Sequence, residues 1–274
     1  MEKRAVSIKD NLHFNFLNNN VLLKSKRSQI TIFIILAIMI VVVLLLIFVG
    51  TNRVKQVFAP SSPVEQFEKC IQDRTKEGMN IISLQGGSIN PENYYLYNDS
   101  KVGYLCYTNE YYKKCVNQVP LLKQHIENEI NSYVSPKMND CLSELKTSLE
   151  KDGNKVSYDS PKLSVKIEQG NVMSEVLLNL VIEKEAIQTY KTIKTSVGSD
   201  LYNNIMIASS INSFEASYGD SEVLNYMLFY PKLKLEKKKQ GDGTKIYIIT
   251  NKDSNERFIF AERSAVLPSG VTGK

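Results

Sequence analysis

The chain has 274 residues, of which 43% are hydrophobic, and carries a formal net charge of +5. This charge is uneven, because residues 1–28 hold six basic and two acidic side chains, whereas residues 51–274 hold 28 and 27. A nearly neutral main part argues against nucleic acid as a partner, since that binding depends on neutralising phosphates. The 224 residues that follow Gly50 are enough for one large or two small domains with hydrophobic cores.

Residues 29–50 contain the uncharged run ITIFIILAIMIVVVLLLIFV, from Ile30 to Val49. Twenty helical residues span about 30 Å, the thickness of the hydrocarbon core of a bilayer. We therefore expect a single transmembrane helix at residues 29–50, with the lipid bilayer as a partner. The alternative, a buried helix of a soluble core, is disfavoured because nothing else in the chain is apolar enough to surround it.

Residues 1–28 show no firm periodicity and are interpreted as a basic cytoplasmic leader. Positive charge beside a membrane helix is retained in the cytoplasm. The N-terminus is therefore expected inside the cell membrane, and the C-terminal domain outside.

The sequence KSKRSQ at residues 24–29, followed directly by the apolar run, resembles the class III signal of archaeal type IV pilins and archaellins. In that family a prepilin peptidase cuts on the cytoplasmic face and leaves the helix on the mature protein. The resemblance implies a cut between Ser28 and Gln29, although Phe33 stands where the family has glutamate and the leader is long. The pattern KRSQITIFII, with a later cysteine-bearing helix that ends in LQGG, is also similar to uncharacterised single-pass membrane-anchored archaeal surface proteins. The alternative is a plain signal anchor that keeps its leader.

A helix is predicted to begin at residue 62, after a short juxtamembrane linker at residues 51–61. Ser62 can cap it, Pro63 occupies its first position and Glu65 completes a capping box. Apolar residues continue at helical spacing to Gly86-Gly87, which should end the helix. These residues are Val64, Phe67, Ile71, Met79 and Ile82.

Two aromatic strands, 94–97 and 102–107, are predicted to form a hairpin around a polar turn. The turn holds the only N-glycosylation acceptor sequence, so Asn98 is a candidate glycosylation site. Seven tyrosines between residues 94 and 112 could contact a sugar or a partner protein. We favour the simpler interpretation, in which they are strand residues with about half of their rings in the core.

Pro120 opens a second helical region that should end at Asp152-Gly153, and Ser135-Pro136 either kinks one helix or begins another. All four cysteines follow the apolar run, in the compartment where disulfides persist. Of three possible pairings we favour Cys70 with Cys141, because both lie beside the apolar stripes of helices, and Cys106 with Cys115. Free thiols are the alternative, and the absence of a C-x-x-C pair argues against zinc.

After residue 153 the hydrophobic period changes from helical to alternating. Asp200 is predicted to cap a helix that runs to about Tyr218, and residues 221–227 add a further helical turn. The expected strands are residues 162–168, 172–184, 187–197, 232–239, 245–251 and 257–262. Residues 265–274 are predicted to be a disordered tail.

These elements predict an α+β fold, in which one N-terminal transmembrane helix carries an extracytoplasmic domain of helices and antiparallel sheet. Residues 62–153 form its helical, disulfide-bearing half with the tyrosine-rich hairpin. Residues 154–264 form its sheet-rich α+β half.

The search for catalytic and metal-binding patterns yields little. Because His13 lies on the leader, a serine or cysteine mechanism outside would depend on His125 alone. His125 and Glu129 lie one helical turn apart and could share a metal, but an exposed pair is favoured because two ligands bind weakly. The acidic pairs Glu127/Glu129 and Glu183/Glu185 are interpreted as solvated faces. We expect no cofactor and no metal, and we interpret the lysine-rich residues 232–239 as a charged edge strand rather than a site for anionic polymers.

The first functional hypothesis is therefore a non-enzymatic, membrane-anchored surface protein, pilin-like by resemblance. Its role would be in assembly, adhesion or envelope organisation, with other copies or envelope proteins as partners. The second is a monomeric, membrane-tethered binding or sensory module. An extracytoplasmic hydrolase ranks last because no nucleophile and base are evident. A leader cut before Gln29 would separate the first hypothesis from the second.

Overall fold

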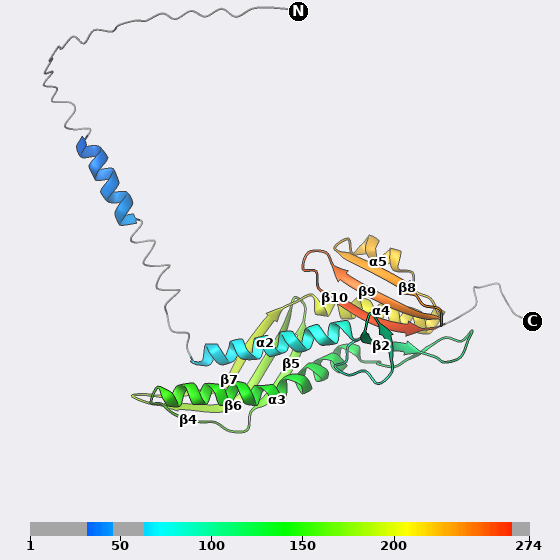
Figure 1. Ribbon diagram of the computed structural model, residues 1–274, viewed down its shortest axis with the longest axis horizontal. Helices are drawn as coiled ribbons and strands as arrows, with labels where there is room; N and C mark the ends of the chain where they lie inside the picture. The colour runs from blue at the N-terminus through cyan, green and yellow to red at the C-terminus, as the bar shows by residue number, and fades with distance from the viewer. Residues whose placement is uncertain (1–31, 46–62, 265–274) are drawn as a thin grey trace, which may run out of the picture. The chain divides into compact units, whose positions relative to one another are not determined.

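The computed structural model describes two parts of the chain, residues 32–45 and residues 63–264. Residues 32–45 form a helix whose side chains are exposed (Figure 1). They belong to one compact unit, Met1–Pro60, and residues 63–264 belong to another, Ser61–Lys274. Among the described residues, no helix is both long and apolar enough to cross a membrane. Several predicted features lie outside the described residues. They are the leader at 1–28, the predicted cut between Ser28 and Gln29, both ends of the predicted membrane helix, the linker at 51–61, the cap Ser62 and the tail at 265–274.

Within residues 63–264 the chain forms helices and two sheets, so the predicted α+β class is confirmed for this part (Figure 1). The helices are α2 (Pro63–Leu84), α3 (Leu122–Lys151), α4 (Leu201–Tyr218) and α5 (Val223–Phe229). The strands are β1 (Tyr94–Tyr97), β2 (Ser100–Tyr107), β3 (Val116–Asn117), β4 (Lys155–Ser157), β5 (Lys162–Glu168), β6 (Asn171–Glu183), β7 (Ile187–Gly198), β8 (Leu233–Lys239), β9 (Thr244–Asn251) and β10 (Arg257–Arg263). Most predicted segments therefore have their counterpart in the structure.

The first sheet joins the two halves of the sequence. Its strand order is β1-β2-β10-β9-β8, and β3 also pairs with β2. β10 runs parallel to β2, while β9 pairs antiparallel with both β10 and β8, so the sheet is mixed and not purely antiparallel as expected. Residues 62–153 and 154–264 consequently share one sheet within a single compact unit.

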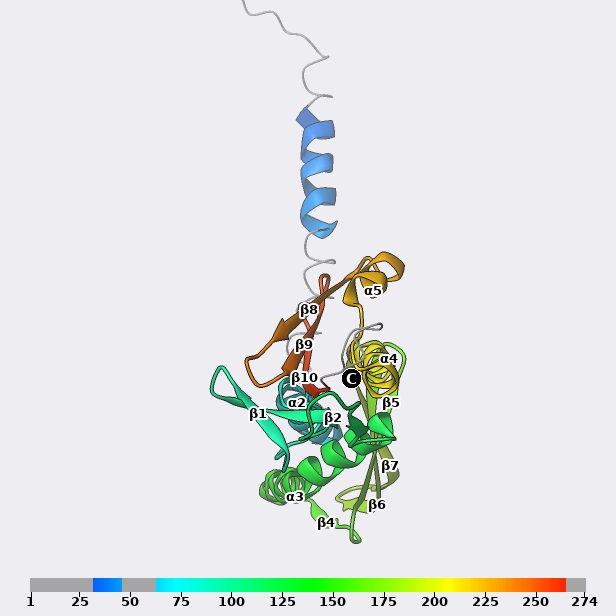
Figure 2. The same cartoon turned by 90° about the vertical axis from the view of Figure 1, so that its right-hand side faces the viewer.

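The second sheet is antiparallel and is built around β6. β7 pairs along one edge of β6, and β5 and β4 pair with successive parts of the other edge. Helices α2 and α3 pack against each other and against this sheet (Figures 1 and 2). The contact is close because Gly78 of α2 has no side chain, and the ring of Tyr133 on α3 lies over it, 2.9 Å from where a Cβ would be. Glycine in a helix interior costs up to about 1 kcal/mol, which this packing offsets.

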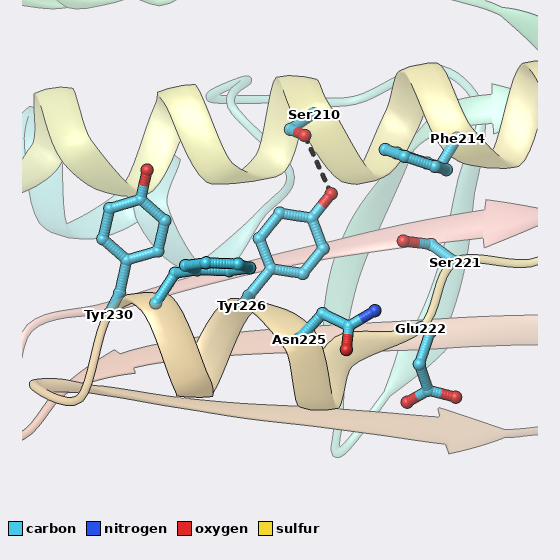
Figure 3. A pocket seen from close by; sticks show the side chains of 8 residues that line it. Ser210, Phe214, Ser221, Glu222, Asn225, Tyr226 and Tyr230 are labelled. Atoms are coloured by element: carbon cyan, nitrogen blue, oxygen red, sulfur yellow. Dashed lines mark hydrogen bonds between the residues drawn. The ribbon is translucent and has the colours of Figure 1, made fainter.

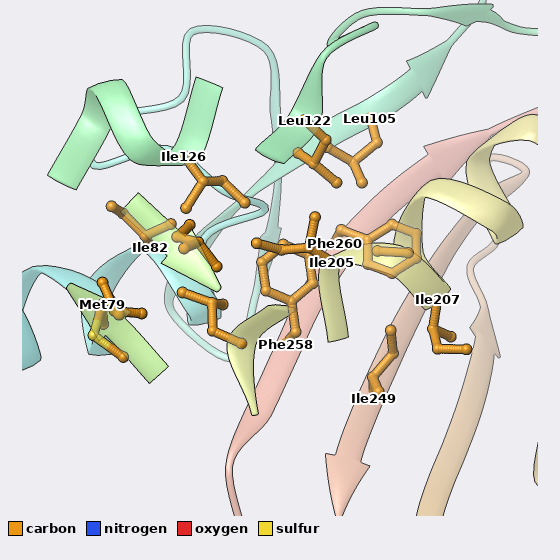
Figure 4. Close-up of a cluster of buried hydrophobic side chains, with 14 of the residues drawn as sticks. Met79, Ile82, Leu105, Leu122, Ile126, Ile205, Ile207, Ile249, Phe258 and Phe260 are labelled. Carbon is orange, nitrogen blue, oxygen red and sulfur yellow. The ribbon is translucent and has the colours of Figure 1, made fainter. Parts of the chain in front are cut away.

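Two main hydrophobic clusters fill the unit. One lies between the second sheet and the paired helices, and the Cys70–Cys141 disulfide joins α2 to α3 beside it. The other lies between the first sheet and α4, and Figure 4 shows Phe258 and Phe260 of β10 at its centre. Side chains from the ends of α2 and α3 also enter it, including Ile82 and Ile126. This cluster fixes α4 against the sheet and so positions the surface described below.

Three local features decide how the helices begin, continue and end. α3 runs without interruption past Pro136, so Ser135-Pro136 does not begin a second helix. α2 ends at Leu84, and Gly86 (φ +73°) follows in the left-handed region, so close to Gly103 that a Cβ would lie 2.6 Å from its carbonyl oxygen. Asp200 precedes α4 as predicted, but its side chain does not cap the helix. Instead the Ser199 Oγ accepts a hydrogen bond from the Leu201 N–H at 3.0 Å, and Asp200 accepts one from Asn251 Nδ2 at 2.7 Å.

Candidate interaction surface

Apolar and aromatic side chains are exposed together on the second half of α4 and along α5, a region that we call the α4–α5 surface. The side chains of Phe229, Leu228 and Tyr218 are 81%, 72% and 69% exposed. The other exposed members are Phe214, Leu224 and Tyr230. None of the seven residues of α5 is buried, although only one of them, Asn225, is polar. Contiguous exposed apolar patches of this kind mark interaction sites.

The local sequence explains why this surface forms. α4 uses its sheet-facing side for the hydrophobic core, so Phe214 and Tyr218, one turn apart with ring centroids 5.6 Å from each other, remain outside. In α5 the core-facing side is occupied by Val223, Tyr226 and Met227, which pack against the core cluster. The remaining apolar side chains of a seven-residue helix then have no neighbour to cover them.

A groove with a volume of about 550 Å³ lies between the two helices. Figure 3 shows Tyr226 and Tyr230 pointing from α5 toward α4, and Phe214 pointing from α4 toward the groove. The hydroxyl groups of Ser210 and Tyr226 hydrogen-bond across it at 2.8 Å. Ser221 also lines the groove, and its buried Oγ has no hydrogen-bond partner among the described residues. Four of the eight residues that line the groove are aromatic, and the other four, Ser210, Ser221, Glu222 and Asn225, are polar.

Lysines lie beside the α4–α5 surface. Lys232, two residues after Tyr230 in the chain, has a side chain that is 75% exposed. Lys252 reaches the same region, since its Nζ donates to the carbonyl of Pro231 at 2.7 Å. Lys234 on β8 lies instead on the opposite face of the first sheet, beside Tyr97 and Ile248. Strand β8 is the edge of the first sheet, which confirms the predicted charged edge strand at residues 232–239.

Beneath the surface, a buried ionic cluster joins α4 to the first sheet. The Lys245 Nζ donates to Glu215 Oε2 and to the carbonyl of Gly219, both at 2.6 Å. The other oxygen of Glu215 accepts from the hydroxyl of Tyr247 and from the Ser221 N–H. Glu215 is fully buried and Lys245 is 6% exposed. Burial, followed by the nearby Glu215 carboxylate, raises the pKa of Tyr247 well above its usual range, so this hydroxyl stays protonated and donates.

Asp220 completes the cluster at its solvent side. Lys237 and Lys245 each hydrogen-bond to it at 3.1 Å. Burial alone would raise the pKa of Asp220, but the ammonium groups of Lys245 and Lys237 hold this pKa below its ordinary value. The cluster thus pins the segment between α4 and α5 to the sheet, and it fixes the base of the α4–α5 surface.

Glu262 on β10 is fully buried, and neither of its carboxyl oxygens has a hydrogen-bond partner among the described residues. Burial and then repulsion from Glu215 raise the pKa of Glu262 well above its ordinary value. Lys245 and the nearby backbone amide of Cys106 act to lower this pKa, but the amide is not positioned to form a hydrogen bond with the carboxyl group. The carboxyl group is therefore protonated over a wider pH range than an exposed glutamate.

This shift predicts a pH-dependent stability that Glu262→Gln should remove. Because the folded state holds a proton that the unfolded state loses above about pH 4.5, stability contributed by Glu262 is fully present below that pH. It falls as the pH rises toward the folded-state pKa, by about 1.4 kcal/mol per unit. We expect the glutamine variant to gain stability relative to the parent between pH 5 and pH 7, as measured by urea unfolding. A stability difference that does not change with pH would contradict the assignment.

The structure forms the two disulfides that the sequence favoured, Cys70–Cys141 and Cys106–Cys115. Cys106, Cys115 and Glu262 bring three potential metal-ligand atoms within 4.8 Å of one another. The two sulfurs are bonded to each other, however, whereas cysteine binds a metal as a free thiolate. This cluster is consequently a disulfide beside a buried carboxyl group and not a metal site.

His125 has a partner that the sequence did not reveal. Its Nε2 lies 2.8 Å from the Ser88 Oγ, and Glu129 Oε2 accepts from the Ile89 N–H at 2.8 Å. The two helix residues therefore hold the segment after α2 instead of sharing a metal.

The surroundings of His125 also bear on catalysis. Within residues 63–264 no carboxylate hydrogen-bonds to the other ring nitrogen of His125. The amides of Gly86 and Gly87 already donate to Ile259 and Ile82, so they are not available to stabilise an oxyanion.

The prediction that Glu127 lies on a solvated face is wrong. Glu127 is 7% exposed, accepts from the Ile167 N–H at 2.8 Å and pairs with Lys123 at 2.6 Å. It therefore links α3 to β5. Glu129 is half-buried and likewise fixed, as described above, whereas Glu183 is partly exposed and pairs with Lys155 at 3.6 Å.

Five of the seven tyrosines between residues 94 and 112 are strand residues as favoured, whereas Tyr111 and Tyr112 lie in a turn after β2. Tyr104 is buried, whereas Tyr111 and Tyr112 are exposed. Three further tyrosines, Tyr95, Tyr97 and Tyr107, are half-buried and pack on a small cluster on the far side of the first sheet. Asn98 is exposed at the turn between β1 and β2, where a glycan would have room, so its modification stays a prediction.

Comparisons with protein-family models, curated proteins and solved structures find no match to this chain.

Proposed function

We propose that this chain is a membrane-anchored surface protein whose disulfide-bonded outer domain acts by binding and not by catalysis. The observation that carries the proposal is the α4–α5 surface, an exposed apolar and aromatic patch held rigidly on an otherwise well-packed domain. Solvent exposure of these side chains is unfavourable, at about 25 cal/mol for each Å² of apolar area, so such a patch implies a partner that covers it.

Two features support the location outside the cell. Both disulfides connect elements of the folded domain, as expected in an oxidising compartment. The basic residues before the apolar run favour an N-terminus in the cytoplasm. Within this function, a pilin-like protein that assembles with other copies and a single tethered binding module remain the two candidate forms.

Intact mass spectrometry of the protein purified from its own membranes tests the proposal. A mature chain that begins at Gln29 would support the pilin-like form, and a chain that keeps Met1 to Ser28 would leave the tethered module. Reduction should add two hydrogens for each of the two disulfides. A protein that is released from membranes by alkaline carbonate, or that gains no mass on reduction, would overturn the proposal.

A hydrolase is the second candidate, because Ser88 and His125 form a part-buried hydroxyl–imidazole contact. Such a pair needs an orienting acid and an oxyanion site, and the described residues beside it supply neither. We expect Ser88→Ala to leave the binding function of the domain unchanged. Loss of a measured hydrolytic activity in that variant would favour the enzyme instead.

A further inference from the structure

The α4–α5 surface combines features that fit one class of partner. Leu228, Phe229 and Tyr230 follow one another at the end of α5 and are all more than half exposed, and the last two also line the groove toward α4. In Figures 1 and 2, α5 lies at the outer edge of the unit beside β8, on the side away from β4. We call Leu228–Tyr230 the tip of α5. Exposed apolar side chains at the edge of a domain can enter a fluid apolar phase, which needs no matching cavity.

The chemistry around this tip is that of a membrane interface. Aromatic rings of tyrosine and phenylalanine are stabilised where hydrocarbon meets headgroups. Lys232 and Lys252 stand beside the tip, where exposed lysines attract anionic headgroups. Asp253 pairs with Lys232 at 2.7 Å and offsets part of this charge, so the apolar side chains supply most of the expected attraction.

The chain also keeps a membrane within reach. Thirteen residues, 50–62, separate the apolar run at 30–49 from α2. An extended segment of that length spans at most about 45 Å, whereas the 22 residues of α2 are about 33 Å long. Thirteen residues therefore allow the start of α2 to stand up to about 45 Å from a bilayer in which the apolar run is inserted.

From these observations we infer that the end of α5 inserts into the outer face of the bilayer that anchors the chain. Leu228 and Phe229 enter the region between headgroups and hydrocarbon, and Lys232 and Lys252 contact anionic headgroups. The inference rests on the proposed function, because it takes the anchored topology as given and names the bilayer as the partner of the α4–α5 surface.

The absence of tryptophan from the chain allows a direct test. The full-length protein, reconstituted into vesicles of mixed zwitterionic and anionic phospholipid, would carry a single tryptophan at Phe229→Trp. Ile187→Trp provides the matched control, since Ile187 is 71% exposed on β7 and lies outside the α4–α5 surface. Leu228→Trp serves as a second probe of the tip, and intact disulfides report that each variant is folded.

We expect brominated phospholipids to quench the tryptophan at position 229 or 228 about twofold or more, with a blue-shifted emission, and to leave position 187 nearly unchanged. Replacing the anionic lipid by zwitterionic lipid should weaken the quenching. Equal quenching at positions 229 and 187, or none at either tip position, would overturn the inference. A blue shift without quenching, together with cross-linked dimers, would overturn it in favour of contact between two copies.

Carbonate extraction of the same vesicles separates this inference from the proposed function. Protein that is extracted would refute the anchor itself. Protein that stays in the membrane while its tip tryptophans remain unquenched would refute only the contact between α5 and lipid.

Discussion

Glu215→Ala is expected to lower the free energy of unfolding by about 3–5 kcal/mol, because it leaves the Lys245 ammonium group buried without its main counter-charge. The hydroxyl of Tyr247 and the amide of Ser221 would lose their acceptor in the same step. Urea unfolding followed by circular dichroism would measure the loss. Because Ser221 lies between α4 and α5, we also expect the α4–α5 surface to become mobile, which amide hydrogen exchange would show.

A double-mutant cycle separates loss of the ion pair from loss of packing. Combining Glu215→Ala with Lys245→Met should recover part of the stability, because the unpaired charge is gone. The matched control is the Glu175–Lys194 pair at 3.2 Å, with side chains that are 39% and 59% exposed. Removing Glu175 should cost at most about 1 kcal/mol. Similar losses for the two glutamates would contradict the assignment of Glu215 as a structural anchor.

Replacing Cys70 and Cys141 together by alanine is expected to cost about 4 kcal/mol, because the bond closes a loop with a sequence separation of 71 residues. Removing it enlarges the conformational freedom of the unfolded chain and loosens α2 against α3. The measurement is the urea midpoint of the full-length chain under oxidising conditions.

The second disulfide provides the comparison. Cys106 and Cys115 are only nine residues apart, so the same loop-closure argument predicts a smaller cost of about 2.5 kcal/mol. If the short bridge proved the more important of the two, constraint of the unfolded chain would not explain the stabilisation. Strengthened packing of β2 and β3 near Glu262 would then be the better explanation.

Local signals in the sequence predicted most elements because their causes are local. Gly86 and Gly87 adopt positive φ after α2, as expected of residues without a Cβ. The strands around Gly170 alternate because one face of each meets the core and the other meets water. The pairing of cysteines also followed from local pattern, since Cys70 and Cys141 each stand beside an apolar stripe.

Other predictions failed where a distant residue decided the outcome. Ser199 and not Asp200 caps α4, because Asn251 from β9 engages the Asp200 carboxylate. Glu127 is buried because the unpaired amide of Ile167 on β5 needs an acceptor. Ser88 approaches His125 only because the segment after α2 folds back on α3. In each case the partner lies at least 37 residues away along the chain, so the periodicity of a single helix or strand could not reveal it.

The sequence by itself determined most of the helices and strands and the uncharged run that predicts a membrane anchor, since these depend on periodicity, composition and a few residues with special backbone preferences. It favoured one cysteine pairing of three, which the structure then formed. Only the tertiary structure decided which apolar side chains stay uncovered. Leu228 and Phe229 are as apolar as the residues of the core, so their type alone does not show that they are exposed. They are exposed because no other element of the described domain covers this side of the seven-residue helix α5. Likewise, Lys245 belongs to an alternating strand, and its burial depends on Glu215 of a helix that the fold places against it.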